Sequence, residues 1–243
     1  EFPENLSLGL KKEADLRYGE NPNQPGAMYR LQGTNLAGLT NIRLAKSGKG
    51  GLSETNVMDV ARALEILKYF SDPAVAVMKH LVPSGFARQF LGNSLDSIYL
   101  SARDADSRSA FGSVVVLNRP VDKATAEAII SSYVEGVAAP EFEHGAMEIL
   151  DGKKDLRAIL YSHLDKLPKF TGDDPSGWYS SIGLPTGRVL IQRPYLSSIR
   201  SAKDLVLDAL VEHEGTVHMV ERDPTSTELD NLQAAWYINL GVR

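Results

Sequence analysis

A lysine and a histidine follow directly after a short apolar run, and the imidazole of a histidine can transfer protons. The run is the valine-rich segment 74–78, and Lys79, His80 and the Pro83-Ser84-Gly85 segment come after it. An imidazole, with an unperturbed pKa of about 6.5, is the usual proton shuttle near neutral pH. The Pro-Ser-Gly segment is predicted to form a turn whose backbone N–H groups face an anion. The alternative is a structural histidine beside a strand, which is the commoner role of an isolated histidine.

Arg17 and Tyr18 lie in a second stretch that could bind an anion. The glycines and prolines between residues 16 and 26 predict a shaped loop in place of a regular element. A guanidinium group beside a phenol hydroxyl can hold a phosphate or a carboxylate. The alternative is a surface arginine and a half-buried tyrosine in a turn, and the residues alone leave both interpretations open.

Other stretches fail the spacing tests for common sites. The segment Gly48-Lys49-Gly50-Gly51 has neither the upstream glycine nor the following Ser or Thr of a nucleotide-binding P-loop, so a flexible loop is predicted. The sequence contains no Gly-x-Ser-x-Gly elbow and no Gly-x-Gly-x-x-Gly fingerprint. The remaining histidines do not show zinc-ligand spacing and are interpreted as surface or core residues; they are His144, His163, His213 and His218.

The elements that must position these residues follow an alternating helix and strand pattern. Segment 74–78 is predicted to be a buried internal strand, because it is a short apolar run between turn signals. The alternation predicts an α/β fold with a largely parallel or mixed sheet, in which ligands bind at the carboxyl ends of strands. Predicted helices run from Thr55 or Asn56, the candidate N-caps, to 67, and over 94–105, 122–132, 142–150, 202–212 and 229–240; predicted strands cover 113–117, 136–140, 157–161, 188–192 and 216–220.

The composition changes after residue 162. Lys, Pro, Asp, Gly and Ser become frequent up to residue 184, which predicts a linker or an excursion between subdomains. We therefore expect a first subdomain over residues 1–162, a linker over 163–187 and the start of a second subdomain over 188–243.

Overall composition narrows the class of protein. The 243 residues carry 26 Lys and Arg against 31 Asp and Glu, without a basic cluster, which argues against a nucleic-acid partner. The absence of cysteine excludes disulfides, thiolate nucleophiles and cysteine-ligated metals. No apolar run approaches the roughly 20 residues of a membrane span, and the first residues do not resemble a signal peptide. We therefore expect a protein of the cytoplasm that has no membrane partner.

Several strings of this sequence resemble one family, the AICAR transformylase domain of the bifunctional purine-biosynthesis enzyme that also carries IMP cyclohydrolase. They occur in the family's order along the whole chain. The strings are LRYGENPNQ (16–24), LSETNVMD (52–59), PAVAVMKHLVPSG (73–85), SAFGSVVVLNRPVD (109–122), VEGVAAPEFEHGAMEIL (134–150) and TSTELDNLQAAW (225–236).

The resemblance implies a reaction and a fold. The reaction is the transfer of a formyl group from the cosubstrate 10-formyltetrahydrofolate to the 5-amino group of AICAR, which gives FAICAR. The implied fold is a cytidine-deaminase-like three-layer α/β/α sandwich without the deaminase zinc, so no metal is expected in this chain. The family's active sites lie across a homodimer interface, which implies a homodimer or an association with a chain that supplies further parts.

The resemblance also implies roles for individual residues. His80 resembles the family's proton shuttle, and Lys79 resembles its cationic neighbour, which orients substrate and stabilises developing charge. The implied substrate-binding residues hold the nucleotide end, contact AICAR or wall the aminoimidazole; they are Arg17, Tyr18, Asn56, Phe111, Gly112 and Glu135.

This sequence departs from the family's pattern at three matched positions. Asn23 stands where the family has His, Val82 replaces a small polar residue, and Glu135 stands where Asp is usual. These departures bear on fine specificity more than on the class of reaction.

The resemblance covers the transformylase part alone. We expect the cyclohydrolase activity to be absent, and a further subdomain that supplies a catalytic Asn, folate contacts and a potassium site to lie beyond Arg243. The leading hypothesis is therefore a transformylase subunit that is catalytic when the remaining half is supplied. The alternatives are a non-catalytic or partner-dependent nucleotide-binding half-domain and an unrelated small-molecule enzyme on a deaminase-like fold.

Overall fold

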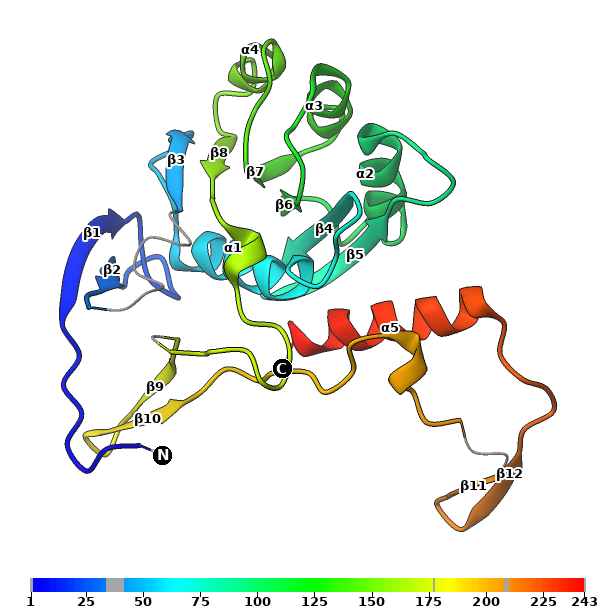
Figure 1. Cartoon of the computed structure of the whole chain (residues 1–243). Coiled ribbons are helices and arrows are strands. Elements are labelled where there is room, and N and C mark those ends of the chain that lie inside the picture. The colour runs from blue at the N-terminus through cyan, green and yellow to red at the C-terminus, as the bar shows by residue number, and fades with distance from the viewer. Residues whose placement is uncertain (1, 34–41, 177, 208–209, 243) are drawn as a thin grey trace.

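A computed structural model describes residues 2–33, 42–176, 178–207 and 210–242 (Figure 1). The strands are β1 (Leu10–Leu16), β2 (Gly26–Leu31), β3 (Arg43–Lys46), β4 (Ala74–Lys79), β5 (Val82–Arg88), β6 (Ser113–Leu117), β7 (Val134–Ala139), β8 (Arg157–Leu160), β9 (Ser180–Leu184), β10 (Arg188–Gln192), β11 (Leu210–His213) and β12 (Thr216–Met219). The helices are α1 (Glu54–Leu67), α2 (Leu95–Asp104), α3 (Lys123–Ile130), α4 (Ala146–Asp151) and α5 (Ser226–Leu240), with 3₁₀ turns η1 (Leu164–Lys166) and η2 (Ala202–Asp204).

A mixed six-stranded sheet forms the centre of the molecule, in the order β3-β8-β7-β6-β4-β5. Strands β6, β7 and β8 are parallel, whereas β4 runs antiparallel to both β5 and β6. The α/β class and the mixed sheet predicted from the sequence are confirmed. Strand β4 is internal, as expected, because it has a hydrogen-bonded neighbour on either side.

Helices cover the two faces of this sheet, and the alternating side chains of the strands explain how (Figure 1). Ala74, Ala76 and Met78 face a core that includes α1, whereas Val75 and Val77 face the core of α2, α3 and α4. All five side chains are fully buried. A strand that is covered on both faces must be apolar at every position, which is the pattern of segment 74–78.

The helix caps differ in part from the predicted ones. Helix α1 begins after Ser53, whose hydroxyl accepts a hydrogen bond from the backbone N–H of Asn56, so the predicted caps Thr55 and Asn56 are wrong. Asn56 occupies the third helical position, and its Oδ1 accepts a hydrogen bond from the backbone N–H of Ser53 over 3.2 Å. This reciprocal capping box fixes where the helix starts. Asp122 caps α3, as predicted for the helix over residues 122–132.

The predicted Pro83-Ser84-Gly85 turn is wrong, because these residues belong to β5. The actual turn lies between Lys79 and Val82, which pair with each other across a tight hairpin. Its central residues, His80 and Leu81, both have positive φ, 53° and 68°. Turns of this kind usually contain Asn or Gly, so the sequence gives no signal for this one.

The helix predicted over residues 202–212 is also wrong. The described part of this segment contains the short turn η2 and then β11, which pairs with β12, while residues 208 and 209 lie outside the described residues. Glu214 and Gly215 connect the two strands with φ of 49° and 75°. A two-residue turn with positive φ at both positions favours a hairpin over a helix.

The segment after residue 162 extends beneath the sheet and includes the hairpins β9–β10 and β11–β12, and α5 then packs against α1 (Figure 1). Tyr237 of α5 is buried, and its ring stacks on Tyr69 with a centroid distance of 4.3 Å. The helix predicted over residues 229–240 and the strands over 188–192 and 216–220 are confirmed in their positions. The division of the chain into subdomains at residues 162 and 187 stays a prediction.

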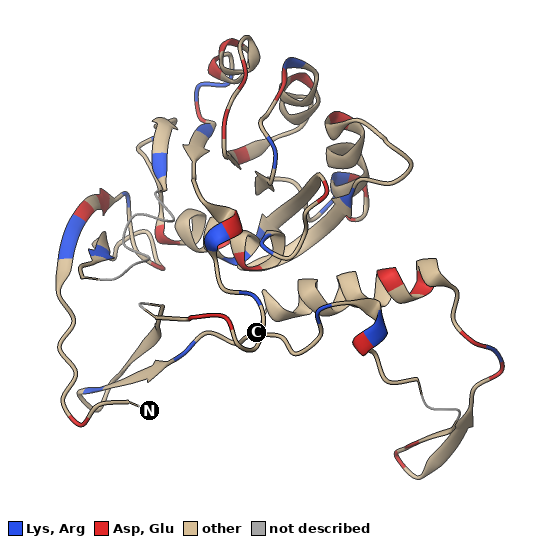
Figure 2. Cartoon of the chain, in the orientation of Figure 1, with Lys and Arg blue, Asp and Glu red and all other residues tan. Residues whose placement is uncertain are grey.

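Lys, Arg, Asp and Glu are interspersed over the whole ribbon (Figure 2). Among the described residues, no helix combines the length and the apolar character needed to cross a membrane.

Gly85 allows a close approach between β5 and α2, which yields a stability prediction. A Cβ atom at this position would lie 1.8 Å from the carbonyl oxygen of Ala102 on α2. We expect Gly85→Ala to lower the free energy of unfolding by about 1–3 kcal/mol, because the helix must move away. Urea unfolding measures this, with Gly183→Ala on β9 as the control, since a Cβ there meets nothing within 4 Å. Equal unfolding midpoints for both variants would contradict the prediction.

Candidate active site

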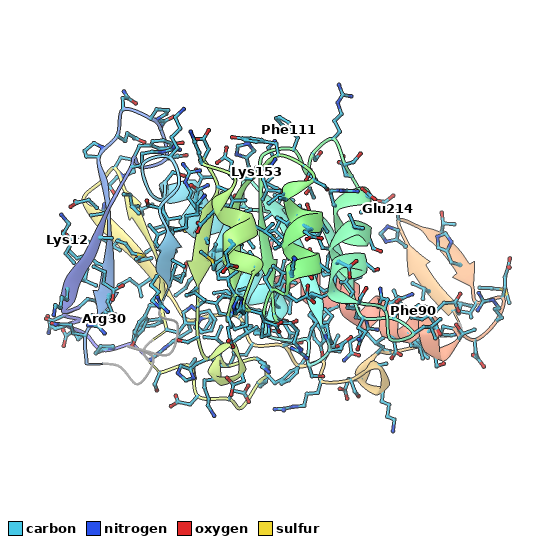
Figure 3. The ribbon with its side chains drawn as sticks, turned by 90° about the horizontal axis from the view of Figure 1, so that it is seen from above. Lys12, Arg30, Phe90, Phe111, Lys153 and Glu214 are labelled. Carbon is cyan, nitrogen blue, oxygen red and sulfur yellow. The ribbon has the colours of Figure 1, made fainter. Side chains whose placement is uncertain are left out.

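The candidate residues meet at one edge of the central sheet. Because β4 is antiparallel to β6, its carboxyl end lies beside the amino ends of β6, β7 and β8. The site therefore lies at the amino edge of the parallel strands, whereas the sequence interpretation placed it at their carboxyl edge. Figure 3 shows Phe111, which precedes β6, at this edge, and Phe90 at the opposite edge.

Lys79 and His80 lie where β4 ends and the hairpin turn begins. The ammonium group of Lys79 donates a hydrogen bond to the backbone carbonyl of Phe111, so it is fixed over the start of β6. His80 is exposed at the tip of the turn. The hairpin thus presents a cation and an imidazole side by side to solvent.

Phe111 and Gly112 form an apolar wall beside Lys79. The Phe111 ring is 62% exposed and lies 5.0 Å from the Tyr133 ring, centroid to centroid. Gly112 adopts φ of 72° and donates its backbone N–H to the carbonyl of Tyr133 over 2.9 Å. A flat ligand could stack on this exposed ring.

Asn56 and Glu135 meet between α1 and β7. The side-chain amide of Asn56 donates to Oε2 of Glu135 over 3.3 Å, and Asn56 itself is only 4% exposed. The same carboxylate oxygen lies 3.9 Å from Nη1 of Arg157. Glu135 therefore links α1 to the start of β8.

Arg157 at the start of β8 is a central member of this site that the sequence interpretation missed. Only 3% of it is exposed, and it donates to the carbonyl oxygens of Gly51 and Lys49, each over 2.7 Å. Burial and then the positive charge of Arg17 lower the pKa of Arg157. The loop 48–51, predicted to be merely flexible, is therefore held against β8.

Arg17 and Tyr18 lie on the other side of that loop. Arg17 donates through Nη1 to the carbonyl of Lys49 over 3.1 Å and through Nη2 to the hydroxyl of Tyr18 over 2.6 Å. Lys49 therefore receives hydrogen bonds from two arginines at a single carbonyl. The Arg17 side chain is exposed, so it is available to an anion that approaches from solvent.

Asp59 on α1 is a second charged residue that the sequence interpretation missed. It is 4% exposed, and its Oδ1 accepts a hydrogen bond from the backbone N–H of Leu81 over 2.7 Å. Burial raises the pKa of Asp59 to about 6, although the Leu81 N–H and the charge of His80 act in the opposite direction. A carboxylate thus lies beneath the turn that carries His80.

Both missed residues had a signal in the sequence. Asp59 comes three positions after Asn56, and so lies on the same face of the helix that also carries the buried Val60 and Ala63. Arg157 begins the otherwise apolar strand Arg-Ala-Ile-Leu. Charged residues are almost never fully buried without partners, so a charge inside a buried pattern indicates a specific site.

The arrangement combines the groups that acyl transfer to an amine requires. An imidazole can take up a proton, a lysine can stabilise an oxyanion, and the exposed guanidinium of Arg17 can bind an anionic substrate. Within the described ranges, no group of three or more His, Asp or Glu residues is arranged to hold a metal ion. All residues expected from the sequence lie in this region, namely Arg17, Tyr18, Asn56, Lys79, His80, Phe111, Gly112 and Glu135.

Comparisons with known proteins point to one group. The family model described as AICARFT/IMPCHase bienzyme matches residues 1–242. The chain is 38% identical over 240 residues to the bifunctional purine biosynthesis protein PurH of Sorangium cellulosum, covering 98% of this chain and 41% of that protein. It is 34% identical over 232 residues to PurH of Acetivibrio thermocellus, covering 96% and 40%. The chain thus spans about two fifths of the length of these relatives.

Proposed function

Because the chain belongs to the AICARFT/IMPCHase bienzyme family, we propose that it carries out the AICAR transformylase step of purine biosynthesis. In this reaction the 5-amino group of AICAR takes a formyl group from 10-formyltetrahydrofolate, which gives FAICAR and tetrahydrofolate. The observation that supports the proposal most directly is the convergence of Lys79, His80, Arg17 and Glu135 on one connected edge of the sheet.

His80 and Lys79 are assigned to the chemical step. The AICAR amine forms a bond to the formyl carbon, and His80 takes up the proton that the amine must lose. Lys79 stabilises the negative charge that develops on the formyl oxygen. The bond from that carbon to N10 of the folate then breaks, and the proton passes from His80 to the leaving nitrogen. Atoms and charge balance without a metal or an oxidant.

The remaining residues are assigned to AICAR binding. Arg17 and Tyr18 bind the phosphate end, since an exposed guanidinium beside a hydroxyl suits a phosphate. Asn56 and Glu135 supply polar contacts, and Phe111 with Gly112 walls the aminoimidazole ring. We further propose the cytidine-deaminase-like form of the α/β/α sandwich, a cytoplasmic location, and a homodimer or a complex with a chain that supplies further parts of the site.

The decisive experiment is a formyl-transfer assay. This chain is incubated with AICAR and 10-formyltetrahydrofolate, alone and together with the remaining segment of a PurH relative, and tetrahydrofolate formation is followed by absorbance. Turnover in either mixture supports the proposal. If AICAR binds but no mixture turns over, the chain is instead a non-catalytic nucleotide-binding half-domain. That second candidate is favoured by the closed hydrogen-bond network that links Arg17, Lys49 and Arg157 within this chain.

Arg17→Ala is expected to weaken AICAR binding by about 1.5–3 kcal/mol, because a charge-assisted phosphate contact is lost. Titration calorimetry measures the dissociation constant. Arg30→Ala is the matched control, since Arg30 lies on the neighbouring β2 and pairs with Glu13 over 3.2 Å. The control should bind AICAR as the wild type does. Equal affinities of the Arg17 variant and the wild type would rule out the phosphate contact.

A further inference from the structure

The turn that carries His80 has a backbone conformation that its sequence does not favour. His80 and Leu81 both lie in the left-handed region, with φ of 53° and 68°. A residue other than glycine is disfavoured there, by an amount of order 1–3 kcal/mol, and persists only when its surroundings hold it. The pairing of β4 with β5 and contacts from the surrounding structure therefore hold this turn.

Asp59 makes the contact that holds the turn from outside. Its Oδ1 accepts the backbone N–H of Leu81 over 2.7 Å, from a helix 22 residues earlier in the chain. Asp59 is 4% exposed, and it lies within the first two turns of α1, whose start is fixed by the Ser53 and Asn56 capping box. The acceptor is thus rigidly placed, and the turn is attached to the helix that also carries Asn56.

The charges around Asp59 are those of the proposed site. The groups that act on it are His80 on the turn, Glu135 on β7 and Glu54 on its own helix, together with the Leu81 N–H. Burial dominates and raises the pKa of Asp59 to about 6, so the carboxylate is charged above that pH at an energetic cost. A buried carboxylate that holds the backbone of the turn and faces His80 and Glu135 is therefore a candidate functional residue.

We propose that Asp59 is the positioning residue of the site: its carboxylate clamps the His80–Leu81 turn and so sets where the imidazole is presented. This inference rests on the proposed function for its catalytic consequence. The clamp itself is a property of the free protein, so it is testable without substrate.

The first test follows the Leu81 amide by NMR in the full chain. In Asp59→Ala the Leu81 N–H loses its acceptor, and its hydrogen exchange should quicken by about tenfold or more relative to the wild type. In the wild type, the side-chain carboxyl carbon signal of Asp59 should shift with a midpoint near pH 6. Glu65→Gln is the matched control, because Glu65 is another α1 carboxylate whose pKa burial raises, and it pairs with Lys68 instead. An unchanged Leu81 amide in Asp59→Ala overturns the clamp.

The second test separates positioning from a purely structural role. The folded-state pKa of Asp59 lies above its ordinary value of 3.8, so the folded state binds the proton more tightly. Stability relative to Asp59→Asn should therefore fall as the pH rises from about 4 to about 6, and stay low above that range. The stability difference between the two proteins is then least favourable to the wild type above about pH 6. If the fold instead stabilised the charged form of Asp59, the stability of the wild type relative to Asp59→Asn would rise with pH.

The third test measures catalysis in the complete enzyme. Asp59→Ala, which removes the acceptor of the Leu81 N–H, should lower kcat by about tenfold or more while the AICAR dissociation constant stays within about threefold, because the imidazole is misplaced and the binding residues are not. A wild-type kcat in a variant whose Leu81 amide is released would overturn the positioning role. If the wild-type enzyme does not transfer formyl groups, the proposed function fails, while the NMR result still decides the clamp.

Discussion

His80→Ala is expected to slow formyl transfer by about 10²–10⁴-fold and to leave the AICAR dissociation constant within a few-fold of the wild type. His80 lies exposed at the tip of the β4–β5 hairpin, so its removal deletes the proton acceptor without opening the core. The Lys79 contact with the Phe111 carbonyl and the Arg17 contacts do not involve the imidazole. Single-turnover kinetics in the complete enzyme, with binding measured separately, test this expectation.

The control for this prediction is His144→Ala. His144 is likewise exposed, but it lies between β7 and α4, where β7 leaves the opposite edge of the sheet. That variant should keep the wild-type rate. Unchanged turnover in His80→Ala would remove the imidazole from the chemical step and leave Lys79 as the remaining candidate.

Arg157→Ala is expected to lower the free energy of unfolding by about 3–5 kcal/mol, the range for breaking a buried charged network. The substitution leaves the carbonyl of Gly51 without its charged donor, leaves that of Lys49 with Arg17 alone, and opens a space at the start of β8. AICAR affinity should fall as well, because the loop 48–51, to which Arg17 donates a hydrogen bond, is released. Denaturant unfolding and calorimetry measure the two effects.

Arg222→Ala is the control variant for Arg157→Ala, because it removes an exposed ion pair in place of a buried one. Arg222 pairs with Glu228 over 2.7 Å, but its side chain is 64% exposed, so solvent screens the pair. Its removal should leave the unfolding midpoint nearly unchanged. A similar loss in both variants would mean that the buried contacts of Arg157 add nothing beyond an ordinary surface ion pair.

The elements of the central body were predictable where one physical signal dominates. Segment 74–78 is apolar at every position because β4 is covered on both faces, and α3 follows a side-chain cap at Asp122. Where two signals compete, the sequence was ambiguous. Gly85 suggested a turn, although its actual role is to let the backbone of α2 approach β5.

The spatial grouping of the site residues was harder to predict from the sequence than the identity of the individual residues. Nothing local shows that β4 runs antiparallel to β6, so the edge at which Lys79 meets Phe111 could not be derived from the pattern. The family resemblance indicated most members of the site, whereas Asp59 and Arg157 act through the backbone of other segments. Their partners are Leu81 and the loop 48–51, and such contacts carry no sequence pattern.

The contacts of Arg157 also constrain the order in which parts of the protein can fold during synthesis. The guanidinium joins carbonyls that lie 106 and 108 residues earlier in the chain. A growing polypeptide must therefore be extended past β8 before the loop at residues 48–51, and with it Arg17, can be fixed. Such distant pairings are slow to form because a long loop must close first. The nascent chain thus fixes the loop 48–51 and Arg17 late, after the buried strands that precede β8 have been made.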